Sequence, residues 1–192
     1  MIDGLDASGK STQAHYLNEF LERKGKTVVL RVHPSDDNYF GRKARDFLNM
    51  RGKGAHFASA FFYMLDVIRS VLLYSWQNYD YTVFVRYLMG TAYLPTPFDR
   101  VGYRFFAAVV PTSNLMFFLD VPPENAEERL KESRSRLEMF ENLEELKKIR
   151  KKALNLALMD NWRIIHAEKP INEVQAEIQN VLCGSLQKQE IV

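Results

Sequence analysis

Short apolar runs alternate with longer amphipathic stretches along this 192-residue chain. Residues 27–32, 81–85, 115–119 and 162–165 are rich in β-branched, aromatic and leucine side chains, which indicates short strands. Two of these runs are apolar almost throughout, as is typical of parallel strands buried on both faces. The pattern therefore predicts a parallel sheet that is covered on each side.

Between these apolar runs, apolar residues recur with the spacing of an α-helix. Leu17, Phe20 and Leu21 place an apolar face on a helix over 13–23, which Gly25 ends. Further helices are predicted at 41–50, 56–77, 100–110, 124–132, 143–159 and 171–186. Helices alternating with short strands predict a three-layer α/β fold, with a parallel sheet of about five strands and helices on both faces.

Composition and charge narrow the class of protein. No repeat, low-complexity tract or linker divides the chain, so residues 1–192 are expected to form one domain. Lys and Arg number 26 against 24 Asp and Glu, which gives no overall electrostatic support for a nucleic-acid partner. The single cysteine, Cys183, excludes an internal disulfide and fits a reducing compartment.

The hydropathy pattern also bears on the location of the protein. The most apolar run, 57–74, is interrupted by Asp66 and Arg69, so no segment is expected to span a membrane. The N-terminus lacks the pattern of a signal peptide. We therefore expect a soluble, cytoplasmic protein without a membrane partner.

Residues 4–12, Gly-Leu-Asp-Ala-Ser-Gly-Lys-Ser-Thr, fill every fixed position of the pattern G-x-x-x-x-G-K-[ST] where a helix begins. Its glycines let successive N–H groups point at the phosphates of a nucleoside triphosphate, and the helix N-terminus favours the same charges. Lys10 is expected to reach the β- and γ-phosphates and the Ser11 hydroxyl to ligate Mg²⁺. A chance match in a surface turn is the alternative. The expected nucleotide-binding residues are Gly4, Asp6, Ala7, Ser8, Gly9, Lys10, Ser11 and Thr12.

This pattern should follow a buried parallel strand, but only Met1, Ile2 and Asp3 precede Gly4. Either the given chain lacks most of its first strand or a short stub serves in its place. We expect a truncated first strand, which would weaken both the sheet and the placement of the loop.

Residues that could bind or act on a ligand come directly after several of the predicted strands. In parallel α/β sheets, ligands bind beyond the carboxyl ends of the strands. Four features fall at such ends: residues 4–11, His33-Pro34, Arg86-Tyr87 and Asp120. We expect them to gather on one rim. Phosphoryl transfer needs positive charge and N–H donors around the transferring group, which Lys10 and Arg86 would supply.

An arginine-rich polar segment at 129–136 separates two predicted helices. A lid would have this composition, because it must be soluble when open and clamp phosphates when closed. A solvated run of charges is the alternative. We expect Arg134 and Arg136, in a lid over about 133–141, to contact the transferring phosphate, whereas Arg129 can instead lie on a helix face.

These motifs resemble those of the thymidylate kinases over nearly the whole chain. The similar segments are 4–12 (the phosphate loop with its extra aspartate), 39–45 (a glycine-arginine segment), Arg86-Tyr87 (the end of an Asp-Arg-Tyr motif), 118–126 (the strand and turn before the lid), 134–141 (the lid) and 162–174 (the closing strand and helix). A phosphate loop without arginine, together with arginines in the lid, resembles the branch that stabilises the transferring phosphate from the lid.

The resemblance implies a phosphate-loop kinase that uses ATP and Mg²⁺ to convert dTMP to dTDP, acts on small-molecule nucleotides and is usually a homodimer. The apolar segment 57–73 would suit such a dimer interface, although a buried helix would look the same. The implied substrate-binding residues are Asp6, Arg45, Tyr63, Arg86 and Tyr93, and the implied catalytic residues are Lys10, Arg86, Arg134 and Arg136. No catalytic carboxylate is expected, because a phosphate dianion is already nucleophilic.

Three departures from the family pattern fall on the acceptor side. Val85 replaces the motif aspartate and cannot orient an arginine or hold a metal-bound water. Val67 replaces an arginine that helps to read the base, and 89–93 lacks one residue and the serine of the family's Ser-x-x-Ala-Tyr stretch. Two other interpretations stay open: a kinase of this family with a different acceptor, and a nucleotide-binding regulatory protein without turnover.

Overall fold

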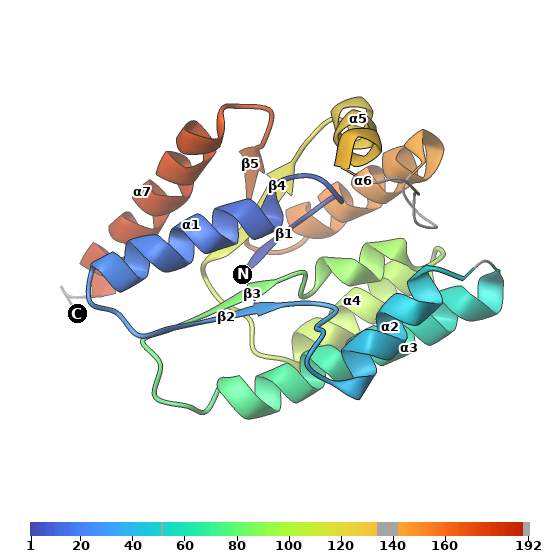
Figure 1. Ribbon diagram of the computed structural model, residues 1–192, viewed down its shortest axis with the longest axis horizontal. Helices are drawn as coiled ribbons and strands as arrows, with labels where there is room; N and C mark the ends of the chain where they lie inside the picture. Colours follow the sequence, from blue (N-terminus) through green and yellow to red (C-terminus); the bar gives the residue numbers. More distant parts are fainter. Residues whose placement is uncertain (51, 134–141, 190–192) are drawn as a thin grey trace.

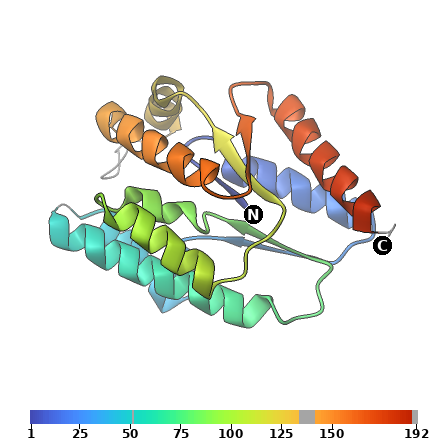
Figure 2. The same ribbon diagram turned by 180° about the vertical axis from the view of Figure 1, so that it is seen from behind.

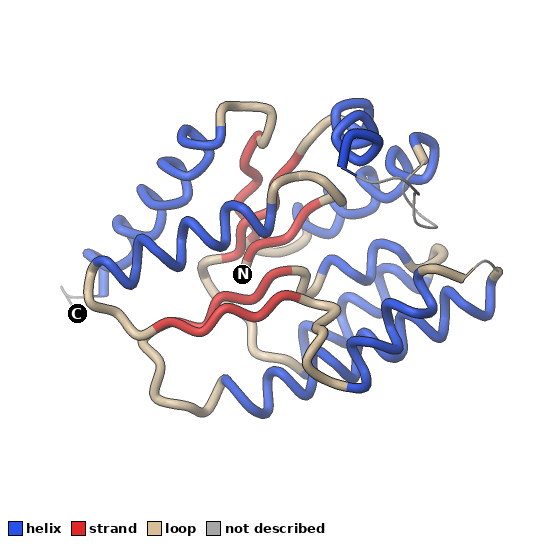
Figure 3. The backbone as a smooth tube through the Cα atoms, viewed as in Figure 1, coloured by secondary structure: helices blue, strands red, loops and turns tan. Residues whose placement is uncertain are grey.

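The predicted parallel sheet is present in the computed structural model, which describes residues 1–50, 52–133 and 142–189. Five parallel strands lie in the order β2-β3-β1-β4-β5 (Figure 3). They are β1 (Ile2–Gly4), β2 (Val28–Val32), β3 (Tyr81–Val85), β4 (Met116–Asp120) and β5 (Trp162–His166). The four strands predicted from apolar runs are confirmed to within one residue at each end.

Helices cover both faces of the sheet (Figures 1 and 2). They are α1 (Lys10–Arg23), α2 (Tyr39–Leu48), α3 (Lys53–Tyr74), α4 (Phe98–Val109), α5 (Pro123–Ser133), α6 (Leu143–Leu158) and α7 (Ile171–Gln189), with a 3₁₀ helix η1 at Met89–Tyr93. The predicted three layers are confirmed. The long helix expected at 56–77 is shifted toward the N-terminus, since α3 starts after Gly52 and ends before Ser75.

Two hydrophobic cores lie on opposite faces of the sheet. One joins α1 and α7 to side chains such as Ile2, Val85 and Leu119, and the other joins α3, α4 and α6 to side chains such as Phe84 and Phe118. All five residues of β4 are buried, as expected for a strand with a helical layer on each side. Burial of both faces leaves the carboxyl rim of the sheet for polar chemistry.

The first strand is three residues long and lies in the middle of the sheet. Ile2 pairs with Val85 of β3 and with Phe117 of β4, and the terminal amine of Met1 donates to Leu115 O at 2.7 Å. Gly4 pairs with Leu119, one residue before the end of β4. The segment that follows β1 therefore starts at the centre of the rim.

Helix α3 departs from one expectation. From the sequence, no segment is expected to span a membrane. Over Gly54–Tyr74, however, α3 is long and apolar enough to cross a membrane by length and composition alone. Here the helix packs along α2, and its fully buried Asp66 accepts hydrogen bonds from Ser35 N and Asn38 Nδ2, each at 2.7 Å. A core helix passes the same length test, so the property is weak evidence for a membrane span.

Candidate active site

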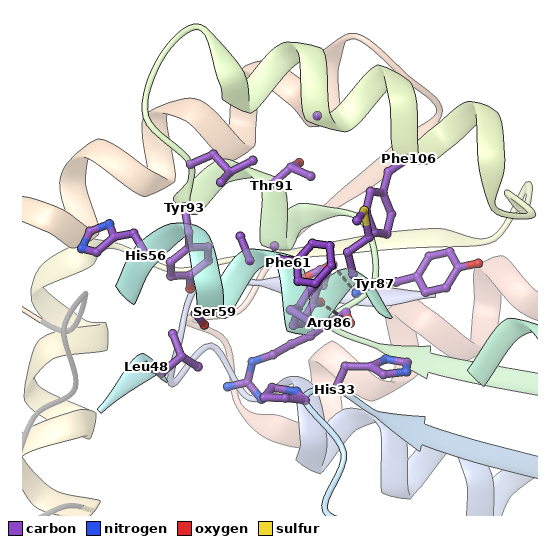
Figure 4. A pocket seen from close by; sticks show the side chains of 18 of the residues that line it. His33, Leu48, His56, Ser59, Phe61, Arg86, Tyr87, Thr91, Tyr93 and Phe106 are labelled. Atoms are coloured by element: carbon purple, nitrogen blue, oxygen red, sulfur yellow. Dashed lines mark hydrogen bonds between the residues drawn. The ribbon is translucent and has the colours of Figure 1, made fainter. Parts of the chain in front are cut away.

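Two pockets meet at the carboxyl rim of the sheet. The phosphate-loop pocket, of about 670 Å³, is lined by Ala7, Ser8, Gly9, Lys10, Ser11, Thr12, Gln13, Arg86, Arg129, Ala167, Lys169, Ile171 and Val174. The second, here called the α2–α4 pocket, has about 600 Å³ and is walled by the turns after β1, β2 and β3 and by α2, α3, η1 and α4 (Figure 4). Arg86 lines both, so a group at its guanidinium can be reached from either side.

The turn between β1 and α1 is built for close backbone approach. A Cβ at Gly4 would lie 2.4 Å from Leu119 O and 2.7 Å from Ser8 Oγ, so only glycine fits there. Gly9 takes a left-handed φ of 87° directly before α1. The buried Ser8 Oγ has no hydrogen-bond partner among the described residues, which leaves a polar atom available inside the loop.

Lys10 lies almost completely buried at the start of α1. Its Nζ donates to Gly4 O at 3.0 Å and to Leu5 O, and lies 4.0 Å from Asp6 Oδ1. The ammonium group is therefore held beside the loop, within the phosphate-loop pocket where the sequence predicted it.

The carboxylate of Asp6 joins two residues of the α2–α4 pocket. Oδ1 accepts from Arg86 Nη2 at 2.6 Å, and Oδ2 accepts from Tyr93 Oη at 2.9 Å. Burial alone would raise the pKa of Asp6, but the charges of Arg86 and Lys10 and these hydrogen bonds hold that pKa well below its ordinary value. Asp6 is therefore an anion at neutral pH and fixes the Arg86 guanidinium.

The turn after β3 has an unusual backbone at Arg86. Its φ of 55° is left-handed, a region that residues other than glycine seldom adopt. Arg86 N donates to Ile2 O at 3.2 Å, and Arg86 O accepts from Tyr63 Oη at 2.5 Å. Asp3 Oδ2 accepts from Tyr87 N at 2.9 Å and Met89 N at 3.0 Å. The turn is thus held from β1 and from α3.

The structure brings the five predicted substrate-binding residues together. Asp6, Arg45, Tyr63, Arg86 and Tyr93 all line the α2–α4 pocket. Arg45 reaches it from α2 and donates to Pro34 O at 2.8 Å and to the Asp36 carboxylate. The two other arginines predicted to act, Arg134 and Arg136, lie outside the described residues.

Arg129 is a site residue whose place the sequence left open. It lies on α5, and its guanidinium donates to Ala7 O at 3.2 Å and to Ala167 O at 3.4 Å. It thereby ties the phosphate loop to the turn after β5. Helical spacing contains the signal, because Ala126, three residues earlier on the same side of α5, is buried.

His33 was predicted to lie at the rim but was not assigned a site role. It is fully buried beside Tyr63 and stacks on Phe84, with ring centroids 5.9 Å apart. Burial lowers the pKa of His33 to about 4, although the Asp66 charge opposes this, so the imidazole is neutral at pH 7. Both ring nitrogens lack a partner among the described residues.

Two of the three departures from the family pattern are buried in the cores. Val85 packs against α1 and α7 and Val67 packs against the opposite face, both with no exposed surface. Neither residue lines either pocket. The carboxylate that holds Arg86 comes instead from Asp6 in the phosphate loop.

Comparison with known proteins gives one consistent result. A family model described as Thymidylate kinase matches residues 2–178. A probable thymidylate kinase of Archaeoglobus fulgidus is 30% identical over 94% of this chain and 92% of its own length, and one of Metallosphaera sedula is 29% identical over 97% and 92%. The solved thymidylate kinase of Candida albicans superposes with a TM-score of 0.75 at 19% identity, over 96% of this chain and 90% of that chain, so the phosphate-loop kinase fold is common to both.

Proposed function

Because the chain belongs to the thymidylate kinase family, we propose that it transfers the γ-phosphate of ATP to dTMP and releases dTDP and ADP. The observation that carries this proposal is the position of Arg86, which lines the phosphate-loop pocket and the α2–α4 pocket at once. A donor on one side and an acceptor on the other would meet at this guanidinium.

The phosphate-loop pocket suits ATP. Gly4 and Gly9 let the backbone curl, the N-terminus of α1 favours anions, and the buried Ser8 Oγ can bind a phosphate oxygen. Residues after β5, among them Lys169 and Val174, would border the base. Bound ATP supplies the phosphoryl group, and Mg²⁺ neutralises part of its charge.

Ser11 is the residue we propose as the Mg²⁺ ligand of the protein. Within 1–50, 52–133 and 142–189, no group of three or more His, Cys, Asp or Glu side chains is placed to hold a metal ion. A hydroxyl at the end of a phosphate loop supplies one oxygen ligand, and magnesium commonly keeps phosphate oxygens and water for the others.

The α2–α4 pocket would hold dTMP. We assign the acceptor phosphate to Arg86 and Arg45, the sugar to Asp6 and Tyr93, and one wall of the base site to Tyr63. The acceptor phosphate oxygen is already a nucleophile and needs no general base. Lys10, Arg86 and the lid arginines Arg134 and Arg136 would balance the charge that develops on the transferring group.

Exposed apolar side chains on α3 and α4, which Figure 2 shows from behind, support a homodimer. The side chains at least half exposed there are Phe57, Phe61, Leu72, Phe98, Val101, Phe105 and Val109. The rings of Phe57 and Phe98 lie 6.3 Å apart and join the two helices. Phe57, Phe61 and Phe105 also line the α2–α4 pocket. An apolar patch that spans two helices marks an interaction surface, and the partner that fits the family is a second copy.

We further propose that residues 1–192 act as one cytoplasmic catalytic domain, with small-molecule nucleotides and not nucleic acid or membrane as partners. The near balance of charge supports this, as does the absence of paired cysteines. The whole proposal is tested by ADP release from Mg-ATP with and without dTMP. ADP release that requires dTMP supports the proposal, and ADP release that does not depend on dTMP contradicts it.

A further inference from the structure

The backbone at Arg86 needs support from outside its own turn. A left-handed arginine is costly, and it persists only where neighbouring groups fix it. The preceding residue, Val85, has an apolar side chain in the core, and its carbonyl accepts from His33 N at 3.0 Å. The guanidinium is held by Asp6, but a bond at the end of a long side chain does not fix φ.

Two contacts act on the Arg86 backbone itself. Arg86 N donates to Ile2 O at 3.2 Å from the β1 side, and the Tyr63 hydroxyl donates to Arg86 O at 2.5 Å from α3, across 23 residues of sequence. Burial raises the pKa of Tyr63 well above its usual value, so the hydroxyl stays protonated and remains a donor. The carbonyl that follows the strained φ is therefore tied to α3.

The ring of Tyr63 is itself confined. A Cβ at Gly90 would lie 2.7 Å from Tyr63 Cε1 and 2.9 Å from Cζ, so glycine at this position leaves the space that the ring occupies. On another side, His33 meets the ring edge-on, with centroids 6.4 Å apart. These neighbours leave the hydroxyl directed at Arg86 O.

We propose that Tyr63 is a positioning residue for Arg86: through its hydroxyl it fixes the left-handed backbone from which the guanidinium meets the acceptor phosphate. This inference rests on the proposed function, because it takes Arg86 to hold that phosphate. The hydroxyl of Tyr63 then has a role that is separate from any contact of its ring with the base. Gly90 contributes to the same role, because it leaves the space that the ring occupies.

Tyr63→Phe tests the hydroxyl and keeps the ring. Loss of one buried hydrogen bond should raise KM for dTMP about tenfold. KM for ATP should stay within about twofold, because no phosphate-loop contact changes. Gly90→Ala should displace the ring and raise KM for dTMP similarly, and the double variant should be no worse than the single ones, since both break the same contact.

Tyr103→Phe is the matched control. Its hydroxyl donates to Asp160 at 2.9 Å and accepts from Trp162 Nε1 at 2.7 Å, and Tyr103 lines neither pocket. This variant should lower Tm and leave both KM values unchanged. A folded Tyr63→Phe protein that behaves in the same way, with an unchanged KM for dTMP, overturns the proposal.

A structural readout separates this inference from the proposed function. If the wild type does not turn over dTMP, the kinase proposal fails. The role of Tyr63 can still be tested by measuring φ of Arg86. Crystal structures of the wild type and of Tyr63→Phe should show φ of Arg86 leaving the left-handed region in the variant. An unchanged φ in the variant contradicts the positioning role whatever the activity.

Discussion

The carboxylate of Asp6 and the guanidinium of Arg86 lie 2.6 Å apart, although 80 residues separate them in the chain. The turns that carry them follow β1 and β3, which are neighbours in the sheet. Because β1 and β3 are adjacent, Asp6 and Arg86 form an ion pair between the phosphate-loop pocket and the α2–α4 pocket although they are far apart in sequence.

Asp6→Asn should impair acceptor binding and stability together. The amide leaves the Arg86 charge without its anion, and breaking this partly exposed pair should cost about 2 kcal/mol in the free energy of unfolding. KM for dTMP should rise while KM for ATP changes little. Urea unfolding and steady-state kinetics measure the two effects, and an unchanged KM for dTMP would count against the assignment of Arg86 to the acceptor.

The same ion pair predicts an acid dependence. The pKa of Asp6 is lower in the folded chain than the unfolded value of about 3.9. Its contribution to stability is therefore complete above about pH 4 and is lost as the pH falls from there toward the folded pKa. Urea unfolding of the wild type and Asp6→Asn from pH 7 to pH 2 should give free energies of unfolding that converge below pH 4. A constant difference would contradict the low pKa.

Arg129→Ala should weaken the donor side alone. Its two hydrogen bonds join Ala7 O to Ala167 O across the phosphate-loop pocket, so their loss should raise KM for ATP by about fivefold to tenfold. KM for dTMP should not change. Lys131→Ala is the control on the same helix, since Lys131 pairs with Glu127 in an exposed i,i+4 contact and should have no kinetic effect.

Val67→Arg should not restore base recognition. The side chain at 67 is fully buried in the core under α3 and α4 and lines neither pocket, so an arginine there is an unpaired charge in an apolar environment. A loss of more than about 4 kcal/mol in the free energy of unfolding is expected. Val67→Ala, as a control, should cost about 1 to 2 kcal/mol. A stable Val67→Arg protein with altered base selectivity would contradict the placement of this residue.

The sequence contained most of the fold, because its signals are local. The runs 81–85 and 115–119 are apolar almost throughout and correspond to β3 and β4, and the pattern at 4–12 ends β1 and opens α1 as expected. The bounds of α3 were less accurate, because residues 53–55 contain no large apolar side chain although they are helical, whereas Trp76 continues the apolar pattern beyond the end of the helix. Gly52 and Ser75, and not hydropathy, mark its limits.

The candidate site was predictable from two signals, the ends of strands and the family resemblance. Arg86 follows β3 directly and Lys10 lies in the loop after β1, whereas Arg45 and Tyr63, on helices, came from the resemblance alone. The place of Arg129 stayed open, because a residue in the middle of a charged helix looks like an ordinary surface position. The contact of Tyr63 with Arg86 O also depends on a positive φ and on the space at Gly90, which one sequence cannot specify.

Passage of phosphate from ATP to dTMP at the junction marked by Arg86 is measured most directly by the formation of labelled dTDP from γ-labelled ATP and dTMP, with the wild type and with Lys10→Ala. The wild type should form labelled dTDP only when dTMP is present, and Lys10→Ala should form it at a rate lower by about 10² to 10³. Folded wild-type protein that binds both nucleotides and forms no labelled dTDP would contradict this transfer.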